Sequence, residues 1–201
     1  MRIKSRWHKS DRPRSMAQVA SVVALIIWRL AENALKRMRT EQYDIDAGPQ
    51  YFAFLRELLI FLIQIADRIA YQRLDAAQRG EFTTALANRV AEILDDNQSE
   101  LLGSPQAGSY KGRFIALLNE LASDYAEFKY ADDGPDFAFL RYLGNRVMET
   151  MVQKDRPWVI DQIMEIEAPQ AVATLQKGLG NLLDVPQQRP AAERGIVGNG
   201  A

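Results

Sequence analysis

Apolar residues recur at three- and four-residue spacing along most of this chain, and no segment shows the sustained alternation that is typical of a strand. The clearest example is the stripe formed by Leu55, Leu58, Leu62 and Ile65. A length of 201 residues with 47% hydrophobic content is enough for one sizeable core. We therefore expect an all-α, single-domain, compact helical bundle of about seven helices.

Capping and breaking residues set the expected helix boundaries. Ser15 and Gln18 form a capping-box pattern, and Gly48 precedes a proline at a typical helix start. Pro157 and Pro169 each predict the first turn of a shorter helix. The expected helices cover about 16–40, 49–74, 157–167 and 169–183, with three more around 82–94, 114–128 and 137–151. The exposed stripe of the second is expected to hold Glu57, Gln64, Arg68 and Asp75.

Charge and composition divide the chain into three parts. Residues 1–14 hold six basic residues against one acidic residue, and they form a basic N-terminal arm. Residues 15–183 form the expected helical domain, whose acidic residues concentrate between Glu92 and Asp136. Residues 184–201 have the composition of a disordered tail.

The sequence Phe-Ala-Phe-Leu-Arg occurs twice, each time shortly after Gly-Pro. It predicts an internal repeat of 16–74 and 108–155, built as two quasi-repeated helical hairpins, with coincidence as the alternative. We expect both arginines to be structural and to reach back to an acid of the preceding loop, Asp46 or Asp133. The motif residues are Phe52, Phe54, Arg56, Phe137, Phe139 and Arg141.

The chemistry available to the chain is narrow. It has no cysteine, which excludes thiol nucleophiles, zinc–cysteine sites and iron–sulfur clusters, and its single histidine is His8. The spacing Asp44-x-Asp46-x-Gly48 is similar to the start of an EF-hand loop, but Leu55 stands where the calcium-binding Glu would be required. We identify no catalytic residue, no metal site and no cofactor site, so an enzymatic role lacks support in the sequence.

Two uncharged apolar runs, at 15–28 and 58–66, are the candidates for membrane insertion. Both are shorter than the roughly 20 residues that a transmembrane helix requires. We therefore expect buried helices, no transmembrane segment and a cytoplasmic location, which the absence of cysteine also suits.

The basic arm is the first candidate for partner binding. Its cations and one tryptophan could bind nucleic acid or an anionic membrane surface, or could lie on the acidic 92–136 region of the same or a second subunit. A flexible solubilising terminus is the alternative. The arm residues concerned are Arg2, Lys4, Arg6, Trp7, Lys9, Arg12 and Arg14.

Gly144 interrupts a strongly apolar helix and is the second candidate. It indicates either a close approach of two helices or a gap that admits an apolar ligand, of which we favour the first. The gap would be lined by Phe137, Leu140, Gly144 and Met148.

These observations favour a non-catalytic accessory or protein–protein interaction protein, with a homodimer or a protein partner as the expected assembly. The alternative is a protein that binds an apolar small molecule or lipid in the core of the bundle. Binding of nucleic acid or an anionic membrane through the basic arm ranks third, because the acidic body would repel phosphates.

Overall fold

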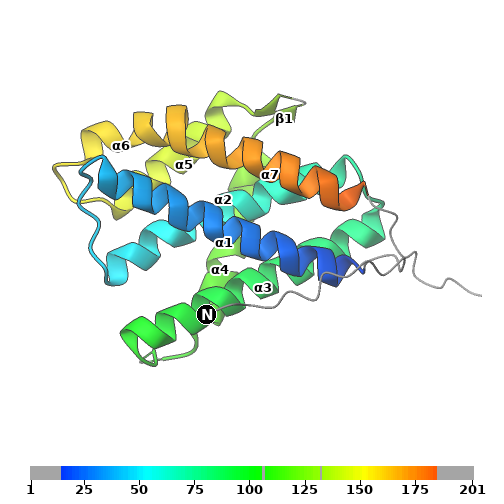
Figure 1. Cartoon of the computed structure of the whole chain (residues 1–201), viewed down its shortest axis with the longest axis horizontal. Helices are drawn as coiled ribbons and strands as arrows, with labels where there is room; N and C mark the ends of the chain where they lie inside the picture. Colours follow the sequence, from blue (N-terminus) through cyan, green and yellow to red (C-terminus); the bar gives the residue numbers. More distant parts are fainter. Residues whose placement is uncertain (1–14, 106, 132, 185–201) are drawn as a thin grey trace, which may run out of the picture.

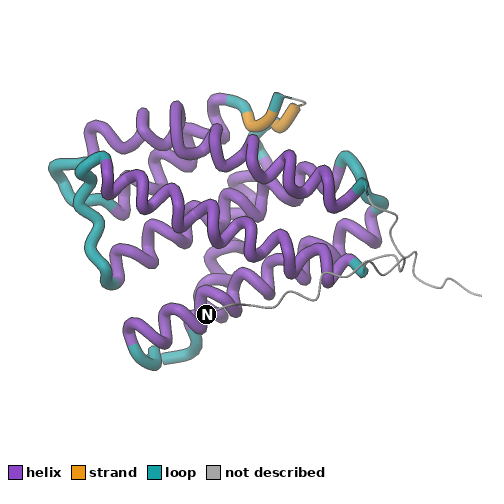
Figure 2. The backbone as a smooth tube through the Cα atoms, viewed as in Figure 1, coloured by secondary structure: helices purple, strands orange, loops and turns teal. Residues whose placement is uncertain are grey.

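The structure is a computed structural model that describes residues 15–184 except 106 and 132. These residues form an all-α bundle with a single two-residue strand pair, as Figure 2 shows, and the expected fold class is confirmed. The basic arm and nearly all of the tail lie outside the described residues. The elements are α1 (Met16–Thr40), α2 (Pro49–Tyr71), α3 (Ala76–Leu102), α4 (Tyr110–Ala126), β1 (Tyr130–Ala131), β2 (Gly134–Pro135), α5 (Phe137–Thr150), α6 (Arg156–Gln162), the π-helical segment η1 (Ile163–Glu167) and α7 (Ala168–Leu183).

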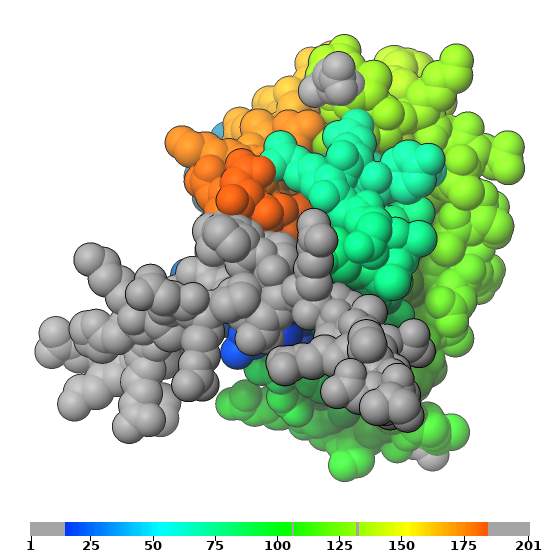
Figure 3. Space-filling view, turned by 90° about the vertical axis from the view of Figure 1, so that its right-hand side faces the viewer, coloured from blue at the N-terminus to red at the C-terminus, as the bar shows by residue number. Residues whose placement is uncertain are grey.

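The helix α2 lies at the centre of the bundle. It packs against α1, α3, α4, α5 and α7, and Figure 1 shows α1 and α7 running side by side next to it. A helix surrounded in this way must be apolar on most of its faces, which the sequence of α2 provides. Figure 3 shows the end of the domain where α7 finishes beside the connection between α2 and α3. There Arg73 Nη1 donates to Asp184 Oδ1 at 2.9 Å.

The helix α1 begins as the sequence predicts. Ser15 Oγ accepts a hydrogen bond from the Gln18 N–H, and Gln18 Oε1 accepts one from the Ser15 N–H, which completes the capping box. By length and composition α1 could cross a membrane, and half of its most apolar 18-residue window is buried inside the bundle. Core helices of folded domains pass the same test, so this property alone does not assign α1 to a membrane.

The last part of the chain differs from the expected pair of short helices. The segments α6, η1 and α7 follow one another without a break, so the described residues form six continuous helices rather than about seven. Pro169 has no N–H to donate to the carbonyl group four residues earlier. The chain continues through it because the preceding turn widens, with the Ala168 N–H donating to the Ile163 carbonyl oxygen five residues back.

The two Phe-Ala-Phe-Leu-Arg segments occupy different positions in their helices. In the first, Gly48 is the N-cap and Pro49 begins α2, so Phe52 is the fourth helical residue and is buried. In the second, Gly134 and Pro135 form β2, the side chain of Asp136 caps α5, and Phe137 is the first helical residue with 71% of its surface exposed.

The surroundings of the two segments differ as well. The helix α1 packs along α2, whereas α4 meets α5 mainly near the C-terminal end of α4, where Tyr125 contacts Phe139 and Asp124 accepts a hydrogen bond from Tyr142. The predicted repeat of 16–74 and 108–155 is therefore not confirmed by the structure.

Candidate functional site

A surface groove of about 350 Å³ lies between α2, α3 and α4. Each helix contributes residues three or four positions apart, which places them on one face of that helix. Two of them, Ala87 and Ala122, are small and leave space between the helices. We call this site the amide-rimmed groove, and it is lined by Ile63, Gln64, Asp67, Thr83, Thr84, Ala87, Asn88, Ile115, Leu118, Asn119 and Ala122.

Among the described residues, Asp67 is the only ionisable side chain that lines the groove, and its charge is neutralised within the protein. Asp67 Oδ1 accepts hydrogen bonds from Arg79 Nε at 2.8 Å and from Thr83 Oγ1 at 2.9 Å, and its second oxygen accepts one from Arg79 Nη2. The hydrogen bond to Asp67 raises the pKa of the Arg79 guanidinium. The groove therefore presents no free charge to a ligand.

Neutral amide groups stand at the rim of the groove. Gln64 and Asn119 form no side-chain hydrogen bond with any described residue. Asn88 donates from its amide nitrogen to the Thr84 carbonyl oxygen at 3.0 Å, which leaves its amide oxygen as an acceptor. Each amide offers both donors and an acceptor. The groove thus combines an apolar floor with uncharged hydrogen-bonding groups.

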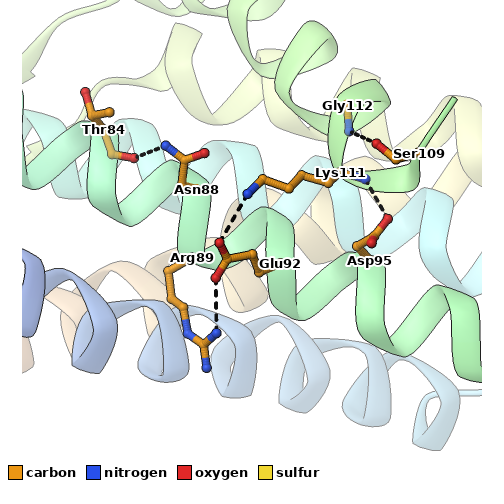
Figure 4. A network of polar contacts seen from close by, with 8 residues as sticks. All are labelled: Thr84, Asn88, Arg89, Glu92, Asp95, Ser109, Lys111 and Gly112. Carbon is orange, nitrogen blue, oxygen red and sulfur yellow. Dashed lines mark hydrogen bonds and ion pairs between the residues drawn. The ribbon is translucent and has the colours of Figure 1, made fainter.

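Polar contacts between α3 and the start of α4 hold the N-terminal end of α4 in place. Lys111 Nζ donates to Glu92 Oε1 at 3.1 Å, and the Lys111 N–H donates to Asp95 Oδ1 at 2.9 Å, as Figure 4 shows. Arg89 pairs with the other oxygen of Glu92 at 3.2 Å. Hydrogen bonds from Lys111 and Arg89 lower the pKa of Glu92. These contacts connect the start of α4 to α3.

Beyond the opposite side of the groove, Arg68 of α2 binds the end of α4. Its Nη2 donates to the Tyr125 carbonyl oxygen at 3.1 Å. This carbonyl group lies in the last turn of α4, where such groups lack partners within the helix. Because α4 is held at both ends, the groove is formed before any ligand binds.

None of the predicted site residues that the structure describes lines the amide-rimmed groove. All residues of the basic arm lie outside the described residues. Gly144 is buried against α6, and a Cβ atom there would lie 3.0 Å from Ile160 Cγ2. This is the close helix approach that the sequence analysis favours. Phe137 is largely exposed, and Leu140 and Met148 are half-buried.

The arginines of the repeated motif do not form the expected contacts with loop acids. Asp46 Oδ1 accepts from the Gly48 N–H instead, and neither Arg56 nor Arg141 has an ion pair with a described residue. Arg56 Nε is buried without a hydrogen-bond partner among the described residues, and burial lowers the pKa of Arg56. Arg141 is exposed. The remaining motif residues, Phe52, Phe54 and Phe139, belong to the core.

Glu57 was expected on an exposed stripe, and this prediction is wrong. Its side chain is only 8% exposed and accepts two hydrogen bonds from Arg146, at 3.0 Å from Nε and 2.9 Å from Nη2. A carboxylate can be buried on this face of α2 because α5 covers it and supplies the compensating guanidinium.

Sequence reasoning missed the amide-rimmed groove because its residues come from three helices whose pairing no local pattern reveals. The available signal was weak: two alanines and several amides at helical spacing. Within residues 15–184, leaving out 106 and 132, no group of three or more acidic or histidine side chains is arranged to hold a metal ion. Comparisons with protein-family models, with curated proteins and with solved structures found no match.

Proposed function

We propose that this chain is a non-catalytic binding protein that takes a small, uncharged and largely apolar molecule in the amide-rimmed groove. The observation that carries this proposal is a groove of about 350 Å³ with an apolar floor and, at its rim, two amides that have no side-chain hydrogen bond to a described residue. Ligand sites commonly have volumes of roughly 300–1,000 Å³ and combine apolar walls with a few polar groups that orient the ligand.

The polar groups in the groove favour binding over chemistry. A general acid or base must be free to exchange a proton with the reacting molecule. Asp67 is the only carboxylate among the described residues of the lining, and Arg79 and Thr83 donate hydrogen bonds to its oxygens. Gln64 and Asn119, which have no side-chain hydrogen bond within the described part of the chain, are amides, which orient a ligand through hydrogen bonds but do not titrate.

An uncharged fluorescent probe, N-phenyl-1-naphthylamine, tests the proposal. It is apolar, carries one N–H donor and fluoresces more strongly when it leaves water. We expect saturable binding to the intact protein. Ala122→Trp would fill the groove and weaken this binding at least tenfold, while Ala116→Trp, on the exposed face of the same helix, would leave it unchanged.

Thermal melts followed by circular dichroism show whether both variants are folded. If folded Ala122→Trp protein binds the probe as tightly as the wild type, the groove is not the binding site. Equal weakening by both substitutions would also contradict the proposal, because the effect would then be independent of the groove.

A protein partner, which the sequence analysis ranked first, is the second candidate function. Three large side chains favour it, since Phe137 is 71% exposed, Trp158 68% and Tyr71 67%. Aromatic residues are enriched at the centres of protein interfaces. A native mass spectrum of the purified full chain separates the two candidates: a dimer without extra mass supports the partner, and a monomer with added small-molecule mass supports the ligand.

A further inference from the structure

A second surface cavity, of about 210 Å³, lies where the end of α1 meets the start of α6. Its lining is more polar than that of the amide-rimmed groove, and the two sites share no residue. We call it the acidic aromatic cavity, and it is lined by Glu41, Gln42, Tyr43, Asp155, Trp158 and Gln162.

Backbone hydrogen bonds hold the α1 side of this cavity in place. The Tyr43 N–H donates to the Met38 carbonyl oxygen at 3.0 Å and closes the end of α1. Gln42, the residue before Tyr43, has a φ of 69°, in the left-handed region where glycine is the usual residue. The chain therefore places an amide side chain in the cavity wall at a position that favours glycine.

Two contacts then connect the segment after α1 to the start of α6. Tyr43 Oη donates to the Trp158 carbonyl oxygen at 3.2 Å. Asp155 Oδ2 accepts from the Asp44 N–H at 2.7 Å. These contacts fix the Tyr43 side chain, the backbone at Trp158 and the Asp155 carboxylate around the same space.

The cavity is negatively charged because its acids have no basic partner. Among the described residues neither Glu41 nor Asp155 forms an ion pair, and no basic residue lines the cavity. Three cations nearby have other partners. Arg37 Nη2 lies 2.5 Å from Glu167 Oε2, Lys154 Nζ lies 3.1 Å from Asp44 Oδ2, and Arg156 Nε donates to the Met151 carbonyl oxygen at 3.1 Å.

The partial charges at the helix ends and the raised pKa of Tyr43 are consistent with this negative charge. The C-terminal end of α1 carries a partial negative charge, and the opposite charge at the start of α6 is offset by Asp155 in the N-cap position. Burial, and then the charges of Asp155 and Glu41, raise the pKa of Tyr43.

The aromatic residues decide which cation would fit. Trp158 is 68% exposed, so a large part of its indole ring is accessible to a ligand. An indole ring attracts a cation above its face, most strongly when the cation is poorly hydrated, as alkylated ammonium ions are. A hydrated metal ion would gain little from these walls.

We propose that the acidic aromatic cavity binds a small organic ammonium ion with alkylated nitrogen, such as a trimethylammonium compound. The ring of Trp158 would contact the methyl groups, and Glu41 and Asp155 would balance the charge. A free cation is favoured over a phosphorylated headgroup, because the two carboxylates would repel an attached phosphate.

Choline is the probe, and the indole N–H signals of the ¹⁵N-labelled full chain are the readout. The chain has three tryptophans, and Trp158→Leu identifies the signal of Trp158. We expect saturable shifts of that signal with choline at constant ionic strength. Binding should be at least fivefold weaker for the neutral isostere 3,3-dimethyl-1-butanol and for phosphocholine.

A double variant that removes the charge of Glu41 and Asp155 but keeps their size tests whether that charge is needed for choline binding. Glu41→Gln with Asp155→Asn keeps the size of both side chains and an acceptor for the Asp44 N–H, and it should weaken choline binding at least fivefold. Glu165→Gln, an exposed position on the same continuous helix, should leave it unchanged.

Three results would overturn the proposal. They are equal binding of choline and its neutral isostere, equal binding of phosphocholine, and unchanged binding in the folded double variant. Probe binding in the amide-rimmed groove is measured separately, so failure at one site is distinguishable from failure at the other.

Discussion

Tyr125 carries a hydroxyl group that is buried without a hydrogen-bond partner among the described residues, and we expect Tyr125→Phe to raise the free energy of unfolding. The ring lies in an aromatic cluster in which phenylalanine would keep each contact. Its centroid is 5.0 Å from those of Phe139 and Tyr142, 6.3 Å from that of Phe128 and 6.5 Å from that of Phe61. Only the hydroxyl group is lost.

The size of the gain follows from the cost of that hydroxyl. An unsatisfied buried polar group costs about 1–3 kcal/mol. Part of this is not recovered, because removing the oxygen leaves a small void and its dispersion contacts are lost. We therefore expect Tyr125→Phe to stabilise the protein by about 1 kcal/mol, which raises the melting temperature by roughly 2–4 °C in a chain of this length.

Urea denaturation at neutral pH measures the change, with Tyr142→Phe as the matched control. Tyr142 Oη donates to Asp124 Oδ2 at 2.5 Å, so losing that hydroxyl should destabilise the protein by about 1 kcal/mol. The two tyrosine substitutions should thus have opposite signs. If Tyr125→Phe instead lowers the free energy of unfolding by about 1 kcal/mol or more, the Tyr125 hydroxyl has a partner, such as a buried water, and the reasoning is refuted.

The other predictions concern backbone strain, helix packing and alkaline pH. Gln42→Gly should stabilise the protein by about 0.5–1 kcal/mol in urea denaturation, because glycine adopts a positive φ without strain; a loss of stability would contradict this. Gly144→Ala should lower the free energy of unfolding by about 1–2 kcal/mol in the same assay, because the added Cβ would lie 3.0 Å from Ile160 Cγ2. An unchanged free energy of unfolding would contradict this, because it would show that α6 shifts without cost to make room for the methyl group. Burial and the hydrogen bond to Asp124 raise the pKa of Tyr142 from 10.0 to about 12 in the folded state, so its stabilising contribution is present below pH 10 and is lost as the pH rises through about 12. The stability of the wild type should therefore fall more steeply over this interval than that of Tyr142→Phe, and identical slopes would exclude this contribution.

The helices could be predicted where the signal is local. The capping box at Ser15 and the Gly48-Pro49 start determine where α1 and α2 begin, because the groups involved are neighbours in sequence. Pro169 gave a misleading signal. A proline often marks the start of a helix, but here a π-helical turn before Pro169 lets the helix continue past it. No local pattern distinguishes a new helix from a continued one.

The sites could not be predicted, because they depend on residues far apart in the chain. Glu57 has the polarity of an exposed residue, and its burial depends on Arg146, which is 89 positions away. The two Phe-Ala-Phe-Leu-Arg segments show the same limitation. Identical residues begin α5 in one case and lie one turn inside α2 in the other, because Asp136 supplies a cap directly before Phe137.

The treatment of carboxylates distinguishes the two proposed sites. In the core and in the amide-rimmed groove, a buried or half-buried carboxylate is matched by an arginine, as Arg79 matches Asp67 and Arg146 matches Glu57. Leaving such a charge unpaired in a low-dielectric environment would cost several kcal/mol, so these pairs are required by the fold itself. In the acidic aromatic cavity Glu41 is exposed to water, and the half-buried Asp155 accepts a hydrogen bond from the Asp44 N–H, so neither acid requires an arginine. Negative charge can remain there without an arginine, and for this reason a cation from solution could complete that site, whereas the groove suits an uncharged ligand.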